Sequence, residues 1–132
     1  MKFHHVCIQT NCYAESLDFY TRVLGMTIEQ ETAGFHGRTY NTWLRAEDFR
    51  IELQTPKAGR FFLPMDSEHT AVAHLCFYVD DLEATCQALQ KKDVHTFLLH
   101  DGQILYQVHG GKLFKLTAPE GTVFEFRDTP GC

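Results

Sequence analysis

The stretch His5-Val6-Cys7-Ile8 returns 69 residues later as His74-Leu75-Cys76-Phe77. In both copies polar and apolar residues alternate, which is the pattern of a β-strand with one buried face. A polar break and then a segment with helical spacing follow each copy. A repeat of this kind indicates that the chain consists of two similar modules, each built from the same succession of elements.

The segments after each copy predict the same order of helix and strands in both halves. Residues 14–24 predict a helix that Gly25 ends, and a second helix runs to about Lys92, with Asp80 or Asp81 as its N-cap. Strand-like segments separated by turn residues follow; they are 27–31, 38–45 and 49–54, and then 94–99, 112–118 and 122–127. Residues 103–109 are either an extra short strand or a loop. We therefore predict an α+β fold in which two βαβββ modules form a cupped mixed sheet.

The length of 132 residues predicts one compact domain with a real core. Its two modules occupy about residues 1–55 and 71–132, and residues 56–70 form the linker between them. The linker contains turn-forming proline and glycine residues. Its apolar stretch Phe61-Phe62-Leu63 is a candidate lid or contact element.

Composition argues against several classes of function. The net charge is −5 and the 12 lysines and arginines are scattered, so the chain lacks the basic face of a nucleic-acid-binding protein. No segment approaches the roughly 20 apolar residues of a membrane helix. The five cysteines show no close pairing and the N-terminus shows no signal peptide, which favours reduced thiols and a cytoplasmic location.

Two histidines and two glutamates recur at matched positions in the two halves. His5 precedes Glu52 by 47 residues, and His74 precedes Glu125 by 51. Side chains alternate between the faces of a strand, and each of these four residues lies opposite a row of apolar residues. Two imidazoles and two carboxylates suit Zn²⁺, Ni²⁺, Co²⁺ or Mn²⁺. The sequence therefore predicts that this quartet binds one divalent cation.

Other polar residues carry weaker signals. Cys7 and Cys76 lie two residues after the proposed histidine ligands, either as small core residues or as neighbours of the site. His4 falls by strand alternation on the face opposite His5, and the remaining histidines have no matched partner. No nucleophile elbow, P-loop or dinucleotide fingerprint is present.

With these residues placed, the chain resembles the vicinal oxygen chelate superfamily, and within it glyoxalase I, over nearly its whole length. The stretch Ser16-Leu17-Asp18-Phe19-Tyr20-Thr21-Arg22-Val23-Leu24-Gly25-Met26-Thr27 is similar to the first helix of glyoxalase I. The start of the second module at His74 and the turn Pro119-Glu120-Gly121 before Glu125 match as well. The resemblance implies a metal-dependent lyase that converts the hemithioacetal of methylglyoxal and glutathione to a lactoyl thioester through an enediolate. Glu125 would be the main base, and Glu52 would serve the opposite face of the substrate.

The resemblance also implies partners and substrate contacts. Arg22 matches an arginine that contacts a glutathione carboxylate, and Lys112, after Gly110-Gly111, matches a lysine near the thiol. Ni²⁺ or Zn²⁺ is the expected cation, with Co²⁺ or Mn²⁺ as alternatives. The chain would form a homodimer with sites at the interface. The family's asparagine-tryptophan-glycine segment after the first glutamate is replaced here, and Ala73 stands in place of a glycine.

Two other functions stay open within this resemblance. One is an enzyme of the same chemistry with another substrate, such as a methylmalonyl-CoA epimerase-like protein. The other is a metal-free protein that sequesters a ligand, as bleomycin-resistance proteins do. Fosfomycin-modifying thiol transferases and extradiol dioxygenases generally use three protein ligands, so the presence of Glu52 disfavours them.

Overall fold

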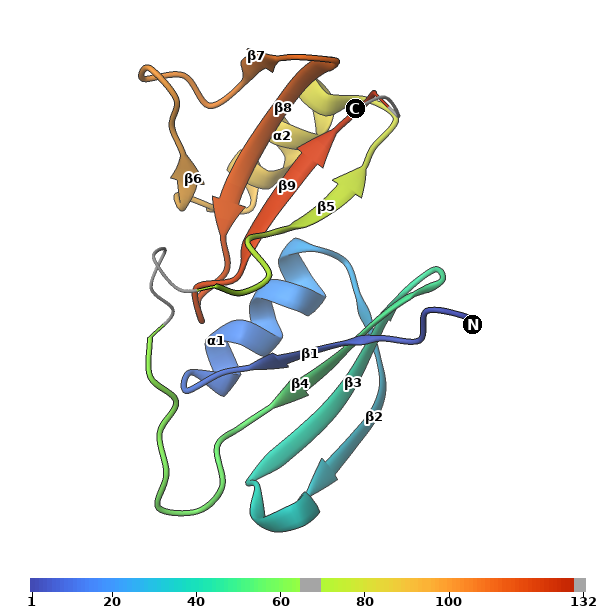
Figure 1. The fold of residues 1–132 in the computed structure, drawn as a ribbon, viewed down its shortest axis with the longest axis vertical. Helices are drawn as coiled ribbons and strands as arrows, with labels where there is room; N and C mark the ends of the chain where they lie inside the picture. The colour runs from blue at the N-terminus through green and yellow to red at the C-terminus, as the bar shows by residue number, and fades with distance from the viewer. Residues whose placement is uncertain (65–69, 130–132) are drawn as a thin grey trace. The chain divides into compact units, whose positions relative to one another are not determined.

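The chain divides into two compact units, Met1–Pro64 and Met65–Cys132. The computed structural model describes residues 1–64 and 70–129 of them. Each unit has its own sheet and its own helix (Figure 1). The predicted modules, about residues 1–55 and 71–132, lie one in each unit. Residues 65–69 of the predicted linker lie outside the described residues.

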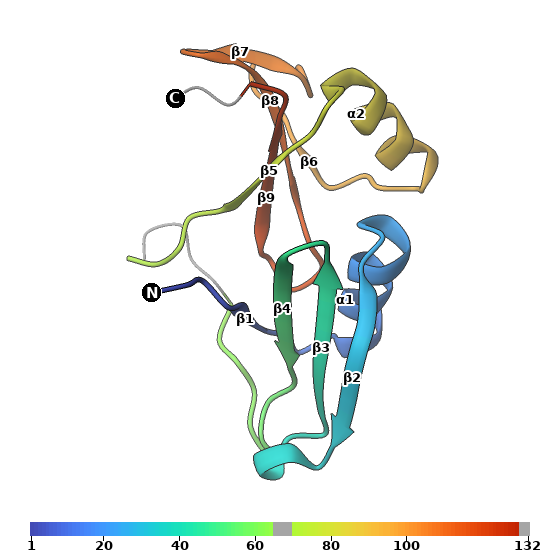
Figure 2. The ribbon, with the colours of Figure 1, turned by 90° about the vertical axis from the view of Figure 1, so that its right-hand side faces the viewer.

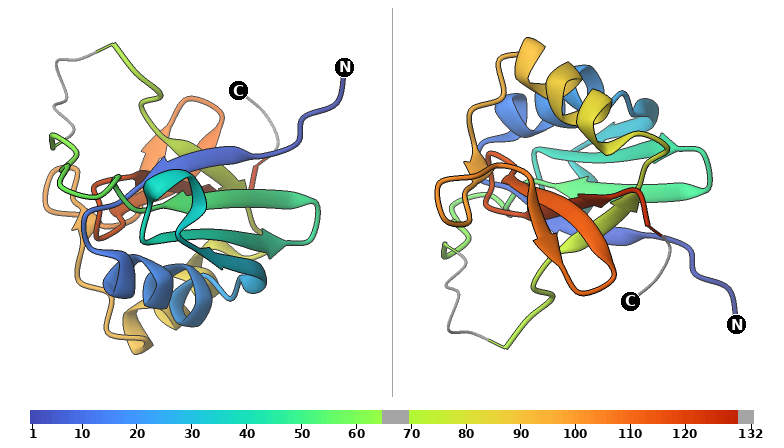
Figure 3. Two further views of the ribbon diagram at one scale, coloured as in Figure 1. Left: turned by 90° about the horizontal axis from the view of Figure 1, so that it is seen from below. Right: turned by 90° about the horizontal axis from the view of Figure 1, so that it is seen from above.

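The first unit is a βαβββ module, as predicted. Its sheet has the strand order β1-β4-β3-β2, in which β1 is parallel to β4 and the other pairs are antiparallel. Strand β1 lies along the edge of this sheet, and the first residues of the chain extend beyond it (Figure 3). The elements are β1 (Val6–Gln9), α1 (Tyr13–Asp18), the π-helix η1 (Phe19–Val23), β2 (Thr27–Ala33), the 3₁₀-helix η2 (Phe35–Gly37), β3 (Tyr40–Ala46) and β4 (Phe49–Gln54).

The second unit repeats this plan with one strand more than predicted. Its sheet has the order β5-β9-β8-β6, and β5 is parallel to β9 just as β1 is to β4. The segment left open in the prediction contains a short strand that pairs with β8 through the turn at Gly110. The elements are β5 (Leu75–Tyr78), α2 (Leu82–Lys91), β6 (Phe97–Leu98), β7 (Tyr106–Val108), β8 (Gly111–Thr117) and β9 (Val123–Arg127).

The first helix winds differently from the predicted α-helix over residues 14–24. After Asp18 it continues as a π-helix, in which the amide of Leu24 donates to the carbonyl of Phe19. Wider winding turns different side chains inward, so Phe19 and Val23 are buried while Leu24 is only partly buried. Gly25 ends the helix with a φ of 74°, as predicted.

The second helix follows its prediction more closely. The side chain of Asp81 accepts a hydrogen bond from the amide of Ala84 at 2.8 Å, which makes Asp81 the N-cap rather than Asp80. Leu82 and Leu89 are buried against the sheet. Within residues 1–64 and 70–129, no helix has both the length and the apolar character needed to cross a membrane.

In each unit the helix lies on one face of the unit's own sheet (Figure 2). The strand residues that point toward the helix are the apolar rows of the prediction, including Ile51 and Leu53 in β4 and Phe124 and Phe126 in β9. The opposite face, which we call the open face, carries His5 and Glu52 in the first unit, and the matching histidine and glutamate in the second.

Candidate metal centre

The first pair of predicted ligands comes together through the parallel strands β1 and β4. Cys7 of β1 is the register partner of Glu52 of β4, and His5 lies one residue before β1 begins. The Nε2 atom of His5 is 3.5 Å from Oε2 of Glu52. Because strand alternation places His5 and Cys7 on one side, the pair forms on the open face of the first sheet.

The second pair repeats this geometry in β5 and β9. Cys76 is the register partner of Glu125, and His74 lies one residue before β5 begins. The Nε2 atom of His74 is again 3.5 Å from Oε2 of Glu125. Glu125 is 6% exposed and is the only charged residue among the buried side chains of the described residues. The duplication seen in the sequence is therefore also a duplication of side-chain geometry.

Each pair suits coordination of a shared cation. With metal–ligand bonds of about 2.0–2.2 Å, neighbouring nitrogen and oxygen ligands stand roughly 3.0–3.4 Å apart, close to the observed separation. No group of three or more histidine, cysteine, aspartate or glutamate side chains is arranged to hold a metal in the described part of the chain. Each unit thus brings two of the predicted ligands together, and joint binding of a cation by all four stays a prediction.

His5 is oriented by two aromatic neighbours. Its Nδ1 atom shares a hydrogen bond of 2.8 Å with Nδ1 of His4, and its ring meets that of Trp43 edge-on at a centroid distance of 4.8 Å. These contacts leave Nε2 directed at Glu52, and such outer contacts commonly fix the ring of a metal-binding histidine. The predicted placement of His4 on the helix side is wrong, because its ring contacts His5 and Trp43 on the open face.

Glu125 has hydrogen-bond donors at both carboxylate oxygens. The thiol of Cys76 donates to Oε1 at 3.4 Å, and the Nζ atom of Lys115 lies 3.1 Å from Oε2. Burial by itself raises the pKa of Glu125, but the hydrogen bonds from Lys115 and Cys76 outweigh it, so the pKa is lowered overall. Glu125 is therefore held as a carboxylate, the form that a cation or a proton-abstracting base requires.

The two thiols beside the glutamates are poor nucleophiles. Partial burial raises the pKa of Cys7 and of Cys76 to about 11, and the adjacent glutamate adds to this through its charge and its hydrogen bond with the thiol. A pKa of about 11 instead of the ordinary 9.0 lowers the fraction of thiolate about 100-fold. A more basic thiolate is about tenfold more reactive, so the net reactivity falls about tenfold.

We therefore expect iodoacetamide at pH 7.5 to modify both cysteines about ten times more slowly in the folded protein than in urea, as peptide mass spectrometry would measure. Equal rates in the two conditions would contradict this.

The two histidine–glutamate pairs differ in the residue that lies beside the glutamate on the next strand of the sheet. Trp43 of β3 is the register partner of Glu52, whereas Lys115 of β8 is the register partner of Glu125. Arg127 lies two residues beyond Glu125 in β9 and so shares its face. Sequence reasoning missed Lys115 and Arg127. In a hairpin with its turn at residues 119–121, position 115 pairs with position 125, so the sequence itself could have indicated the lysine.

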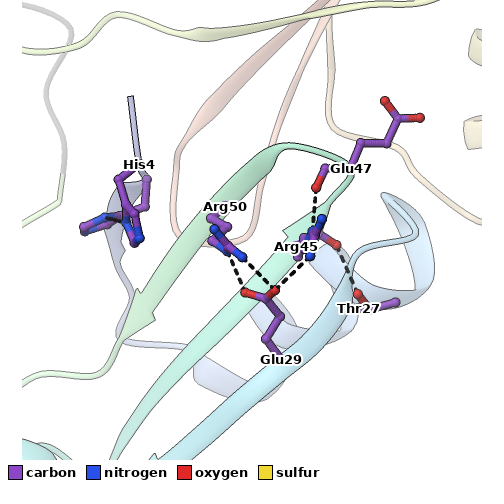
Figure 4. Close-up of polar contacts among 7 residues, drawn as sticks. His4, Thr27, Glu29, Arg45, Glu47 and Arg50 are labelled. Atoms are coloured by element: carbon purple, nitrogen blue, oxygen red, sulfur yellow. Dashed lines mark hydrogen bonds and ion pairs between the residues drawn. The ribbon is translucent and has the colours of Figure 1, made fainter. Parts of the chain in front are cut away.

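Other cations on the open face of the first sheet are already paired. A bulge in β2 leaves Glu29 without a register partner, and its carboxylate accepts hydrogen bonds from Arg50 and Arg45 (Figure 4). The hydrogen bond from Arg50 lowers the pKa of Glu29. Arg45 also donates to the carbonyl of Glu47. The two guanidinium groups share the single carboxylate of Glu29, and Glu52 is the acidic group beside His5.

The two substrate-binding residues implied by the resemblance lie in ion pairs. Arg22 donates to the carboxylate of Asp18, one helical turn earlier, at 2.8 Å. Lys112 pairs with Glu83 of α2 at 3.3 Å. Lys112 thus faces the helix, on the side of the second sheet opposite Glu125. Their substrate roles stay predictions.

Comparison with known proteins gives a family and a fold. The sequence model of the Glyoxalase/Bleomycin resistance protein/Dioxygenase superfamily matches residues 2–126. No curated protein matches the chain significantly.

Solved structures of similar fold include proteins of different activities. A glyoxalase family protein from Enterococcus faecalis is 21% identical, with a TM-score of 0.78 over 95% of each chain. A trypanothione-dependent glyoxalase I from Leishmania major is 18% identical, with a TM-score of 0.70 over 96% of this chain and 85% of that one. A fosfomycin resistance protein from Listeria monocytogenes, solved with Mn(II), is 8% identical, with a TM-score of 0.68 over 97% and 90%. At these identities the likeness is one of fold.

Proposed function

The chain belongs to the Glyoxalase/Bleomycin resistance protein/Dioxygenase superfamily, and from this premise we propose that it is a metal-dependent lyase of the glyoxalase I type. Its substrate would be the hemithioacetal of methylglyoxal and glutathione or of a related thiol. The product would be the lactoyl thioester. The observation that carries the proposal is the duplicated pair of a histidine and a glutamate, each at 3.5 Å, on parallel strands of the two units.

The ligands proposed for the cation are His5, Glu52, His74 and Glu125. The donor set of two imidazoles and two carboxylates fits Ni²⁺ or Zn²⁺, with Co²⁺ and Mn²⁺ as alternatives. A bound divalent cation supplies Lewis-acid stabilisation of the negative charge that develops on the substrate oxygens. The quartet would be completed within one chain or across a homodimer.

The reaction also needs a base that moves a proton between neighbouring carbons. Glu125 is proposed as the main base, because its buried carboxylate is kept ionised by Lys115 and Cys76. Glu52 has the same position beside His5 but has Trp43 in place of the lysine. It is proposed to serve the opposite face of the substrate, and Arg22 and Lys112 to contact the thiol portion.

The test of activity is a thioester-formation assay with methylglyoxal and glutathione after reconstitution with each of the four cations. We expect absorbance from the thioester bond to appear with Ni²⁺ or Zn²⁺ and to be lost after chelation. Metal binding without any thioester would favour another substrate for the same chemistry, as in an epimerase-like protein.

Metal content gives a separate prediction. We expect about one cation for each set of four ligands in the wild-type protein after reconstitution and dialysis, and less than a tenth of that in His5→Ala, measured by inductively coupled plasma mass spectrometry. His95→Ala is the matched control, because His95 is exposed and pairs only with the exposed Asp93 among the described residues. Wild-type protein without metal would instead favour a ligand-sequestering protein.

A further inference from the structure

A row of amide side chains lies next to the first histidine–glutamate pair. Gln54 follows Glu52 by two residues in β4, so strand alternation places both side chains on the open face. Gln9 of β1 and Asn41 of β3 are the register partners of Gln54. We call Gln9, Asn41 and Gln54 the amide row. Nε2 of Gln54 donates to Oδ1 of Asn41 at 2.8 Å, and each amide has further donors and acceptors that a ligand can use.

Arg38 holds its guanidinium group beside the end of β4, next to this row. Its Nη1 atom donates to the carbonyl of Thr55 at 2.7 Å, and its guanidinium carbon lies 6.0 Å from the centre of the Phe62 ring. The side-chain amide of Asn11 fixes residue 62, because it donates to the carbonyl of Phe62 at 2.9 Å and accepts from the amide of Phe62 at 3.0 Å. The guanidinium is thus held by segments of the first unit alone.

Arg38 differs from three other arginines of the first unit. Arg22, Arg45 and Arg50 each pair with a carboxylate. Arg38 is half-buried, and among the described residues it has no acidic partner. Only one of the five N–H groups of its guanidinium is used by the carbonyl of Thr55. The group can therefore still offer the fork of two donors that matches a carboxylate.

The charge of Arg38 reaches the open face of the first sheet. Partial burial and the neighbouring Glu52 raise the pKa of Cys7, and the charge of Arg38 opposes them. Thr55, which holds the guanidinium, follows Glu52 by three residues, roughly 10 Å along an extended strand. A tripeptide is also about 10 Å long when it is extended. A peptide thiol can therefore reach from the histidine–glutamate pair to Arg38, with its peptide groups over the amide row.

We infer that Arg38 is a specificity-determining residue that binds a carboxylate of a peptide thiol, while the amide row binds its peptide groups. The inference rests on the proposed function and narrows the thiol of the substrate to an acidic peptide. It adds a contact to those that the resemblance implies, at Arg22 and Lys112, which already lie in ion pairs. Arg38 orients the substrate and takes no part in the proton transfer.

Two thioethers test the inference without turnover. S-methylglutathione carries two carboxylates, whereas its diethyl ester keeps the peptide groups and has neither negative charge. Calorimetric titration of the Ni²⁺-reconstituted protein should show an affinity for S-methylglutathione about tenfold lower or more in Arg38→Met than in wild type, with the affinity for the diester changed by less than about threefold. Arg38→Lys should fall between the two proteins, because it keeps the charge but loses the fork. Gln54→Leu should weaken both ligands by a similar factor, because both carry the peptide groups.

The matched control removes the same charge from the other end of β3. Arg45 pairs there with Glu29, so Arg45→Met should leave the affinity for S-methylglutathione within about twofold of wild type. Circular dichroism verifies that each variant is folded. Equal weakening of both ligands in Arg38→Met, no weakening, or no binding of S-methylglutathione by the wild-type protein would overturn the inference.

The outcomes also separate this inference from the proposed reaction. The expected affinities without any thioester formation would refute the reaction and retain the role of Arg38 in binding. Thioester formation with an unchanged affinity in Arg38→Met would refute the inference and retain the reaction.

Discussion

Glu125→Gln is expected to lower kcat about 1000-fold while the protein stays folded. Glutamine has the same size and keeps an oxygen that can coordinate a cation, but it cannot accept the proton. General-base catalysis by a positioned side chain typically contributes 10²–10⁴-fold. Turnover of the hemithioacetal should be measured at saturating cation, with metal content determined on the same sample. Near-native turnover in a metal-loaded variant would refute the role of Glu125 as base.

Glu52→Gln is the matched comparison for this variant. It changes the same chemical group beside the equivalent histidine, so a general loss of metal affinity would affect both variants alike. A markedly smaller loss of kcat in Glu52→Gln would support Glu125 as the main base. Equal losses would assign both glutamates to coordination alone.

The pH dependence of stability gives an independent measure of the contacts of Glu125. The folded protein lowers the pKa of Glu125, so the resulting stability is present above the unfolded pKa of about 4.3 and is lost as the pH falls through the folded value. The wild-type protein should therefore lose its stability advantage over Glu125→Gln on acidification below about pH 4.

Phe114→Ala is expected to lower the free energy of unfolding by about 3–5 kcal/mol, a large share of the 5–15 kcal/mol typical of a folded domain. Phe114 has no exposed surface, and its ring stacks on Phe126 at a centroid distance of 4.8 Å and contacts Phe97. Alanine would leave a cavity between β8, β9 and β6. Urea denaturation followed by circular dichroism measures the loss.

An exposed phenylalanine provides the control for this stability measurement. Phe61 is 85% exposed, so Phe61→Ala should change the free energy of unfolding by less than about 0.5 kcal/mol. Phe114→Leu should cost about 1–1.5 kcal/mol, because most of the volume is retained. Similar small effects at both positions would show that the face of β8 toward α2 is not the core of the second unit.

Much of the fold was predictable from local patterns. Strand β4 begins and ends where the alternation of apolar residues predicts, and Asp81 caps α2 as one of two candidates. The π-helical winding of residues 19–23 was not predictable, because the spacing of apolar residues does not distinguish it from an α-helix. Strand β7 depends on pairing across Gly110 and Gly111, which only the three-dimensional structure shows.

The sequence predicted the two histidine–glutamate pairs of the candidate site but not the residues that surround them. The similar spacings of His5 to Glu52 and of His74 to Glu125, 47 and 51 residues, predicted the contacts that the structure contains. The lysine chosen by resemblance, Lys112, faces the helix, whereas Lys115 contacts Glu125. Which lysine reaches the glutamate depends on the register between β8 and β9, because a shift of one residue would exchange the faces.

The parallel pairing of β1 with β4 and of β5 with β9 has a consequence for how the protein folds. In each unit the histidine lies before the first strand and its glutamate lies on the last, so their contact closes a loop of nearly the whole unit. Contacts between residues so distant in sequence form late and slowly. On the ribosome, neither histidine can meet its glutamate until the final strand of its unit has emerged, so a nascent chain acquires its histidine–glutamate pairs one unit at a time.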